Sequence, residues 1–193
     1  GRALIADEMG LGKTVQALAV AFHYRREWPV LIACPASLVA NWTHEVTRWC
    51  RIPPSRIVLA TSTKTPLRLP DGAAVVVGSY ACLASVQHIG FHVLIVDECH
   101  CVKSPTAIRT KLVQGLAKGA KRVLLLSGTP ALSRPAELYH QIELINAADI
   151  VSETSFVLGT PDETRESIRT TVELAKWFAP DMAFFLALTP WPY

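Results

Sequence analysis

The sequence predicts an α/β fold in which a parallel sheet is covered by helices on both faces. In residues 1–146, short apolar runs alternate with longer amphipathic segments, as strands alternate with helices in this class. The apolar runs are continuous, which is typical of strands buried on both faces. Polar residues that could bind a ligand or take part in catalysis follow several of these runs. Parallel sheets bind ligands beyond the carboxyl ends of their strands.

Each element is predicted from apolar periodicity and from residues that begin or end helices. The expected strands are Arg2–Ala6, Pro29–Cys34, Arg56–Ala60, Ala73–Gly78, His92–Asp97 and Lys121–Ser127. The expected helices are Lys13–Arg26, a helix from Ser37 to Trp49, Tyr80–Val86, Thr106–Leu116 and Pro135–Ile145. Ser37 is the expected N-cap of the second helix, and Ser104-Pro105 is expected to begin the fourth.

Composition indicates a globular intracellular domain. Of 193 residues, 50% are hydrophobic and 18% are charged. No apolar run approaches the roughly 18 residues of a membrane helix, so no membrane partner is expected. The five cysteines form no CxxC pair, which favours reduced thiols over a zinc site or disulfides. Residues 1–150 carry a net charge of +6 and residues 151–193 one of −3, which permits a polyanionic partner without requiring one.

The segment after the first strand has the residues that a phosphate loop needs. It reads Asp7-Glu8-Met9-Gly10-Leu11-Gly12-Lys13-Thr14. Small residues let backbone N–H groups close on phosphate oxygens at a helix start, where the helix dipole favours anions. Lys13 would reach the β- and γ-phosphates of ATP, and the Thr14 hydroxyl would bind Mg²⁺. The generic pattern has Gly in place of Asp7, so a plain strand-to-helix turn is the alternative.

Two carboxylates, Asp97 and Glu98, directly follow the fifth predicted strand. A carboxylate beside a phosphate loop can hold the Mg²⁺ shell through water, and a second one can polarise the attacking water. We assign Asp97 to the metal and Glu98 to the water, so that Lys13, Asp97 and Glu98 form the candidate catalytic set. A solvated acidic turn is the alternative, and the phosphate loop favours the catalytic interpretation. Metal binding by Cys99 and Cys101 is not favoured.

A third segment, Ser127-Gly128-Thr129-Pro130, follows the sixth predicted strand. Its hydroxyls could link the nucleotide site to a moving surface by hydrogen bonds, and a plain turn is the alternative. Together the three segments resemble motifs I, II and III of superfamily-two helicase-like ATPases. The Asp7-Glu8-Met9 start resembles the SWI/SNF-type DNA translocases, which makes the whole segment from Asp7 to Thr14 candidate nucleotide-binding residues.

Further segments extend this resemblance. Pro35-Ala36-Ser37-Leu38 with Asn41, Trp42 and Glu45 resembles the motif Ia region, and Gly78-Ser79-Tyr80 resembles the Ib region. Ser133-Arg134-Pro135 departs from the usual family pattern and resembles the annealing-helicase branch, which rewinds DNA at stalled replication forks. The resemblance implies that residues 1–146 are a RecA-like lobe of the P-loop NTPase type, using ATP and Mg²⁺ in DNA repair, fork restart or chromatin remodelling, in the nucleus if the source is eukaryotic.

The resemblance also implies a two-lobe motor on DNA. The motif Ia and Ib regions would touch the sugar-phosphate backbone of duplex or forked DNA, so binding should be independent of sequence. The basic candidates for this contact are Arg48, Arg51, Lys103 and Lys111, although a solvated face is the favoured interpretation for each. An upstream adenine-contacting segment and the second lobe with its catalytic arginine are expected outside this chain. The lobe alone should therefore hydrolyse ATP poorly.

Residues 147–193 show no such pattern, which divergence, an insertion or a damaged reading frame would each explain. Thr160-Pro161-Asp162-Glu163 is a capping box that predicts a helix over Pro161–Phe178. The apolar run Met182–Leu188 is too short to span a membrane. Two other functions stay open. One is an RNA helicase lobe, against which the Asp7–Thr14 segment argues, and the other is a non-catalytic nucleotide- or DNA-binding remnant.

Overall fold

The computed structural model divides the chain into two compact units, Gly1–Ile145 and Asn146–Tyr193. The residues that it describes are 1–7, 10–102, 106–128, 153–158, 164–166, 169, 172–173 and 182–187. Within these residues, no helix combines the length and the apolar character needed to cross a membrane.

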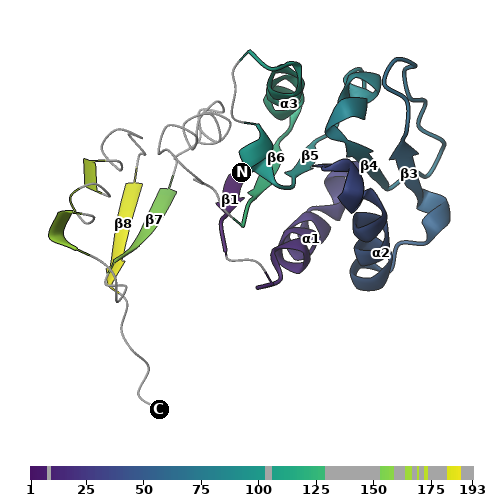
Figure 1. Ribbon diagram of the computed structural model, residues 1–193. Coiled ribbons are helices and arrows are strands. Elements are labelled where there is room, and N and C mark those ends of the chain that lie inside the picture. Colours follow the sequence, from purple (N-terminus) through teal and green to yellow (C-terminus); the bar gives the residue numbers. More distant parts are fainter. Residues whose placement is uncertain are drawn as a thin grey trace. The chain divides into compact units, whose positions relative to one another are not determined.

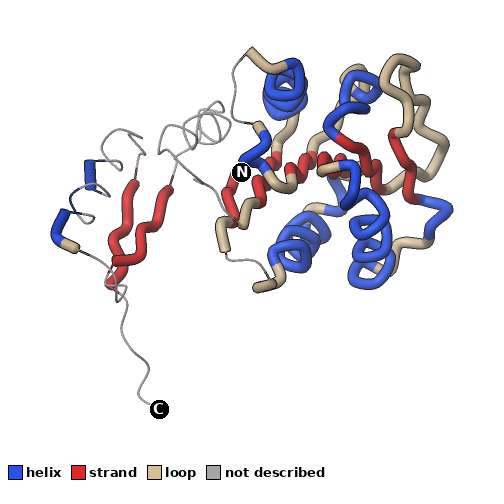
Figure 2. Tube along the Cα trace, viewed as in Figure 1, coloured by secondary structure: helices blue, strands red, loops and turns tan. Residues whose placement is uncertain are grey.

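The first unit is built on a six-stranded parallel sheet (Figures 1 and 2). Its strands are β1 (Arg2–Ile5), β2 (Val30–Cys34), β3 (Ile57–Ala60), β4 (Val75–Ser79), β5 (Val93–Val96) and β6 (Arg122–Leu126). Their spatial order is β1-β6-β5-β2-β4-β3. The sequence predicted all six of these strands to within two residues at each end, and their parallel pairing confirms the predicted sheet.

Three α-helices and several short 3₁₀ segments connect the strands. The helices are α1 (Lys13–His23), α2 (Val39–Cys50) and α3 (Ile108–Gly119). The 3₁₀ segments are η1 (Arg25–Glu27), η2 (Ala36–Leu38), η3 (Pro54–Arg56), η4 (Tyr80–Val86) and η5 (Cys99–Cys101). Along α2, Trp42, Val46 and Cys50 recur every four residues and are buried, so the apolar stripe of this helix faces the sheet.

Two predicted helix starts differ from the structure. Ser37 is not an N-cap, because it lies inside η2 and α2 begins at Val39 with Leu38 as its cap residue. The chain makes a tight 3₁₀ turn directly after Pro35, which takes up the residues that would otherwise form the first helical turn. Helix α3 begins at Ile108, two residues later than predicted. The predicted start at Ser104-Pro105 and the predicted helix Pro135–Ile145 lie outside the described residues.

Helices cover both faces of the sheet, as the sequence predicted (Figure 1). Successive strand residues point to opposite faces, so each face has its own apolar cluster. One cluster, under α1 and α2, includes Ile32, Ile95, Leu124 and Leu126 with Trp42. The other, under η4 and α3, includes Leu31, Leu94, Leu125, Tyr80 and Val113. Strands β2 and β5 are buried along their whole length, which leaves their chemistry to the residues that follow them.

The second unit contains two parallel strands, β7 (Glu153–Leu158) and β8 (Met182–Ala187), with Glu153 paired to Met182. The run Met182–Leu188, which the sequence marked only as apolar, therefore supplies a strand. Inside the predicted helix Pro161–Phe178, the described residues Arg165, Glu166, Arg169, Val172 and Glu173 are helical. The rest of that predicted helix lies outside the described residues.

Candidate active site

The carboxyl ends of the strands bring the three motif segments to one edge of the sheet. The backbone N–H of Asp97 donates to the Ala33 carbonyl at 2.8 Å, and that of Ser127 donates to the Ile5 carbonyl at 3.1 Å. Strand β6 lies between β1 and β5. Neighbouring strands are about 4.8 Å apart, so the end of β1 and Asp97 are separated by roughly 10 Å. A phosphate chain with its metal ion fits between groups at that spacing.

The loop after β1 has the backbone of a phosphate cradle. Gly10 and Gly12 have φ angles of +86° and +79°, a left-handed conformation that glycine adopts without strain. A Cβ atom built on either glycine would have nothing within 4 Å, so the space over this backbone is open. Helix α1 begins at Lys13, and no side chain caps its first turn. The positive end of the helix dipole therefore faces that open space. Glu8 and Met9 lie outside the described residues.

Asp7, the residue that departs from the generic loop pattern, ties the start of the loop to helix α1 by hydrogen bonds. The side-chain amide of Gln16 donates to Asp7 Oδ2 at 2.8 Å and to the Leu11 carbonyl at 3.2 Å. Lys13 Nζ donates to the main-chain carbonyl of Asp7 at 2.7 Å. A glycine at position 7 could not make the first of these bonds. Sequence reasoning did not single out Gln16, although side chains in a first helical turn point back toward the preceding loop.

Asp97 is held by three donors. Trp42 Nε1 donates to Asp97 Oδ2 at 2.7 Å, and the backbone N–H of Glu98 donates to Oδ1 at 2.9 Å. The Tyr80 hydroxyl donates to the main-chain carbonyl of Asp97. Each carboxylate oxygen has two lone pairs, so each keeps one for a further donor such as metal-bound water. The donor set therefore fits the role predicted for Asp97, that of holding Mg²⁺ through its water shell.

Glu98 and Ser127 are joined through one histidine. Glu98 has a φ of 50°, an uncommon conformation for a residue with a side chain and one found at functional sites. Its Oε2 lies 3.1 Å from His100 Nδ1, which in turn lies 3.2 Å from the Ser127 hydroxyl. The second motif thus contacts the third through the side chains of His100 and Ser127. Gly128 is described, whereas Thr129 and Pro130 are not.

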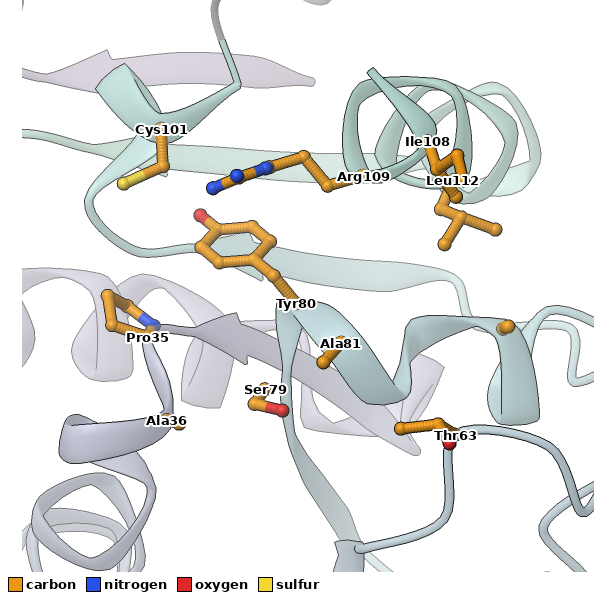
Figure 3. Close-up of a pocket in the computed structure, with 11 residues that line it drawn as sticks. Pro35, Ala36, Thr63, Ser79, Tyr80, Ala81, Cys101, Ile108, Arg109 and Leu112 are labelled. Carbon is orange, nitrogen blue, oxygen red and sulfur yellow. The ribbon is translucent and has the colours of Figure 1, made fainter.

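A cavity lies beside this edge, at the ends of β2 and β4. It has a volume of about 550 Å³ and is lined from the motif Ia side by Pro35 and Ala36 and from the Ib side by Ser79 and Tyr80. Figure 3 shows the Tyr80 ring standing in this cavity, with its hydroxyl toward Cys101 and Arg109. Arg109 is exposed and is the basic residue of the lining.

Of the basic candidates chosen from the sequence, Arg48, Arg51 and Lys111 do not line this cavity. Arg48 and Arg51 lie at the end of α2, which begins near the carboxyl edge and runs back from it for 12 residues, or about 18 Å. Arg48 is exposed and lies 4.9 Å over the Trp49 ring. Lys111 is exposed, and Lys103 lies outside the described residues. Arg109 was missed because its neighbours in sequence carry no recognisable motif.

These features define the class of the first unit. A parallel sheet with helices on both faces, a glycine loop after its first strand and paired carboxylates after β5 is a RecA-like lobe. The chain belongs to the SNF2-related domain family, whose match covers residues 2–179. That match continues past residue 146 into a segment whose residues showed no recognisable family pattern. The extension carries no short motif that could be recognised from residue types alone.

Annealing helicases are among the relatives. The chain is 41% identical over 153 residues to the mouse "DNA annealing helicase and endonuclease ZRANB3", covering 75% of this chain and 14% of that protein. It is 44% identical over 146 residues to the cattle "SWI/SNF-related matrix-associated actin-dependent regulator of chromatin subfamily A-like protein 1", covering 74% of this chain and 15% of that protein. The fold resembles the Sulfolobus solfataricus SWI2/SNF2 ATPase core in complex with dsDNA, with a TM-score of 0.68 and 22% identity over 98% of this chain and 40% of that one.

The thiols nearest the site are buried. Cys34 and Cys99 are 0% exposed, and four of the five free cysteines are buried, with Cys101 half-buried. Burial, with a smaller effect of the Asp97 charge, raises the pKa of Cys34 to about 12. The same causes raise the pKa of Cys99. Both thiols therefore stay protonated near neutral pH.

We predict that Cys34 resists alkylation in the folded chain. At pH 8, a pKa of about 12 leaves a thiolate fraction roughly a thousandfold below that of an ordinary cysteine. Iodoacetamide labelling followed by peptide mass spectrometry should modify Cys101 first and Cys34 only after unfolding in guanidinium. Labelling of Cys34 as fast as Cys101 at pH 8 would show that the Asp97 surroundings are open to solvent.

Proposed function

We propose that residues 1–146 form the ATP-binding lobe of an ATP-dependent DNA translocase of the annealing-helicase type. The observation that carries this proposal is the meeting of the glycine loop, the Asp97-Glu98 pair and Ser127 at one sheet edge. The annealing-helicase names of the relatives support DNA rather than RNA as the track. We propose a role in DNA repair, fork restart or chromatin remodelling, in the nucleus if the source is eukaryotic, on duplex or forked DNA.

ATP would bind with its phosphates over Gly10 to Thr14. Backbone N–H groups at the start of α1 favour an anion there, and Lys13 would exchange its bond to the Asp7 carbonyl for the β- and γ-phosphates. The Gln16 bonds would hold the two ends of the loop while Lys13 moves. Asp7, Glu8, Met9 and Leu11 complete the proposed nucleotide-binding segment.

Asp97 and Glu98 would act on the opposite side of the phosphate chain. Mg²⁺, when bound, neutralises phosphate charge during transfer. Thr14 would hold the ion through its hydroxyl, and Asp97 would hold it through water. Glu98 would accept a hydrogen bond from the attacking water and orient it. In the structure its carboxylate lies against His100, so we propose that it turns from His100 toward the water when nucleotide is bound.

DNA would contact the cavity at the ends of β2 and β4. The motif Ia and Ib segments line this cavity together, and Arg109 adds a positive charge. Backbone contacts of this kind carry no base readout. The proposal therefore replaces Arg48 and Arg51 with Arg109 as the phosphate-contacting arginine.

We predict that Lys13→Ala weakens ATP binding by about tenfold or more, because a charge-assisted bond to phosphate is lost. A titration with a fluorescent ATP analogue in Mg²⁺ would measure this. Lys118→Ala, in the last turn of α3, is the matched control and should bind like wild type. Equal affinity for wild type and Lys13→Ala would rule out this nucleotide site.

We predict that duplex DNA binds without sequence preference and weakens steeply with salt. Arg109→Ala should lower affinity uniformly and reduce the slope of log affinity against log salt by about 1, as the loss of one phosphate contact does. Arg48→Ala should leave both quantities unchanged. The measurement is fluorescence anisotropy of two labelled duplexes across a salt series. A clear preference for one duplex, or equal effects of the two arginine variants, would contradict the proposed surface.

We predict that this chain alone hydrolyses ATP slowly, with or without DNA. Arg2 donates to the Ala117 carbonyl and Arg122 pairs with Glu27, so these arginines are engaged elsewhere. Arg165 and Arg169 are exposed in the second unit. An arginine supplied across the cleft is worth about 10³–10⁵ in rate. Robust DNA-stimulated turnover that Glu98→Gln abolishes would show that no second lobe is needed. Absence of ATP binding altogether would favour a non-catalytic remnant.

A further inference from the structure

Asp97 accepts hydrogen bonds from side chains on both faces of the sheet. Trp42 belongs to the apolar cluster under α1 and α2, and its Nε1 donates to Asp97 Oδ2 at 2.7 Å. Tyr80 belongs to the opposite cluster, under η4 and α3, and its hydroxyl donates to the Asp97 carbonyl. One donor fixes the side chain and the other fixes the backbone. Two elements on opposite sides of the sheet therefore meet at a single residue.

Because both donors are buried, each depends on Asp97 as its hydrogen-bond acceptor. Trp42 is 0% exposed and its indole is a donor only, so Asp97 is the acceptor that keeps this N–H satisfied. Tyr80 is 9% exposed, and burial raises the pKa of its phenol well above the usual value. It therefore keeps its proton and remains a donor. Neither side chain can turn to another position without leaving a buried polar group unpaired.

The same helix carries a natural comparison. Trp49, also on α2, is 49% exposed and donates from Nε1 to Glu45 Oε2 at 2.6 Å. That pair has the chemistry of the Trp42–Asp97 pair but lies in the last turns of the helix, away from the sheet edge. Both tryptophans donate the same kind of hydrogen bond to a carboxylate. They differ in that Asp97 lies at the candidate site, whereas Glu45 does not.

We propose that Trp42 and Tyr80 are the positioning residues that aim the Asp97 carboxylate at the metal ion of bound nucleotide. This inference rests on the proposed function, in which Asp97 holds Mg²⁺. With Trp42 Nε1 on one lone pair of Oδ2 and Glu98 N–H on one of Oδ1, the remaining lone pairs have fixed directions. Loss of either positioning donor leaves Asp97 free to rotate or shift. Partners of this kind typically change metal affinity or activity by about 10–100-fold.

The test separates metal-dependent from metal-independent nucleotide binding and needs no turnover. The dissociation constant of a fluorescent ATP analogue is measured by anisotropy of the analogue, once with Mg²⁺ and once with EDTA. The variants are Trp42→Phe, Tyr80→Phe and the control Trp49→Phe. We expect wild type and Trp49→Phe to gain affinity equally from Mg²⁺. In Trp42→Phe and Tyr80→Phe the gain should fall by about 10-fold or more, with affinity in EDTA unchanged.

Each other outcome overturns a distinct part of the argument. A wild-type chain that binds the analogue without any gain from Mg²⁺ defeats the proposed function, and the inference falls with it. A full gain in both Trp42→Phe and Tyr80→Phe overturns the inference alone. Equal losses in Mg²⁺ and in EDTA would show a merely structural role and also overturn it. If circular dichroism shows that Trp42→Phe does not fold, Tyr80→Phe, which removes one oxygen atom, decides the question.

Discussion

Parallel pairing of all six strands forces the chain to cross back over a face of the sheet after each strand, and this requirement organises the first unit. Every strand then ends at the same edge, so the residues that follow β1, β6, β5, β2 and β4 lie along that edge in this order. Strands β2 and β5 are continuous, fully buried apolar runs, so their own side chains take no part in chemistry. Reactive groups can therefore accumulate at the strand ends without disturbing either apolar cluster.

At this edge, the carboxylate of Asp97 lies where it needs hydrogen-bond donors. Asp97 directly follows a fully buried strand, and a carboxylate in such a position must be hydrogen-bonded. The indole of Trp42 and the N–H of Glu98 meet that need without occupying every lone pair. Stability and function make compatible demands here, since the donors that satisfy the buried side of the carboxylate leave its remaining lone pairs available. The two apolar clusters thus act as rigid supports for the site as well as a source of stability.

The strands and the motif segments could be predicted because their signals are local. A run such as Val93–Val96 followed by Asp97 and Glu98 can be read without knowing its neighbours. The contacts between segments could not be predicted. Trp42 and Asp97 are 55 residues apart, and nothing near Trp42 in the sequence marks its partner. Ser37 failed as a helix cap because a 3₁₀ turn after Pro35 competed with the helix start. Arg109 was missed because its importance comes from a cavity formed by distant segments.

Strand β1 carries a consequence for how the molecule assembles. It lies at the end of the sheet order and pairs with β6, placing Arg2 beside Val123 and Ile5 beside Leu126. The strand that anchors the glycine loop thus depends on the most distant pairing of the sheet, and the entropy of closing so long a segment must be overcome first. On the ribosome, β1 would wait for β6, the last of the six strands in the sequence, to emerge before it could pair. The nascent chain would acquire its glycine loop only when the rest of the sheet is ready to support it.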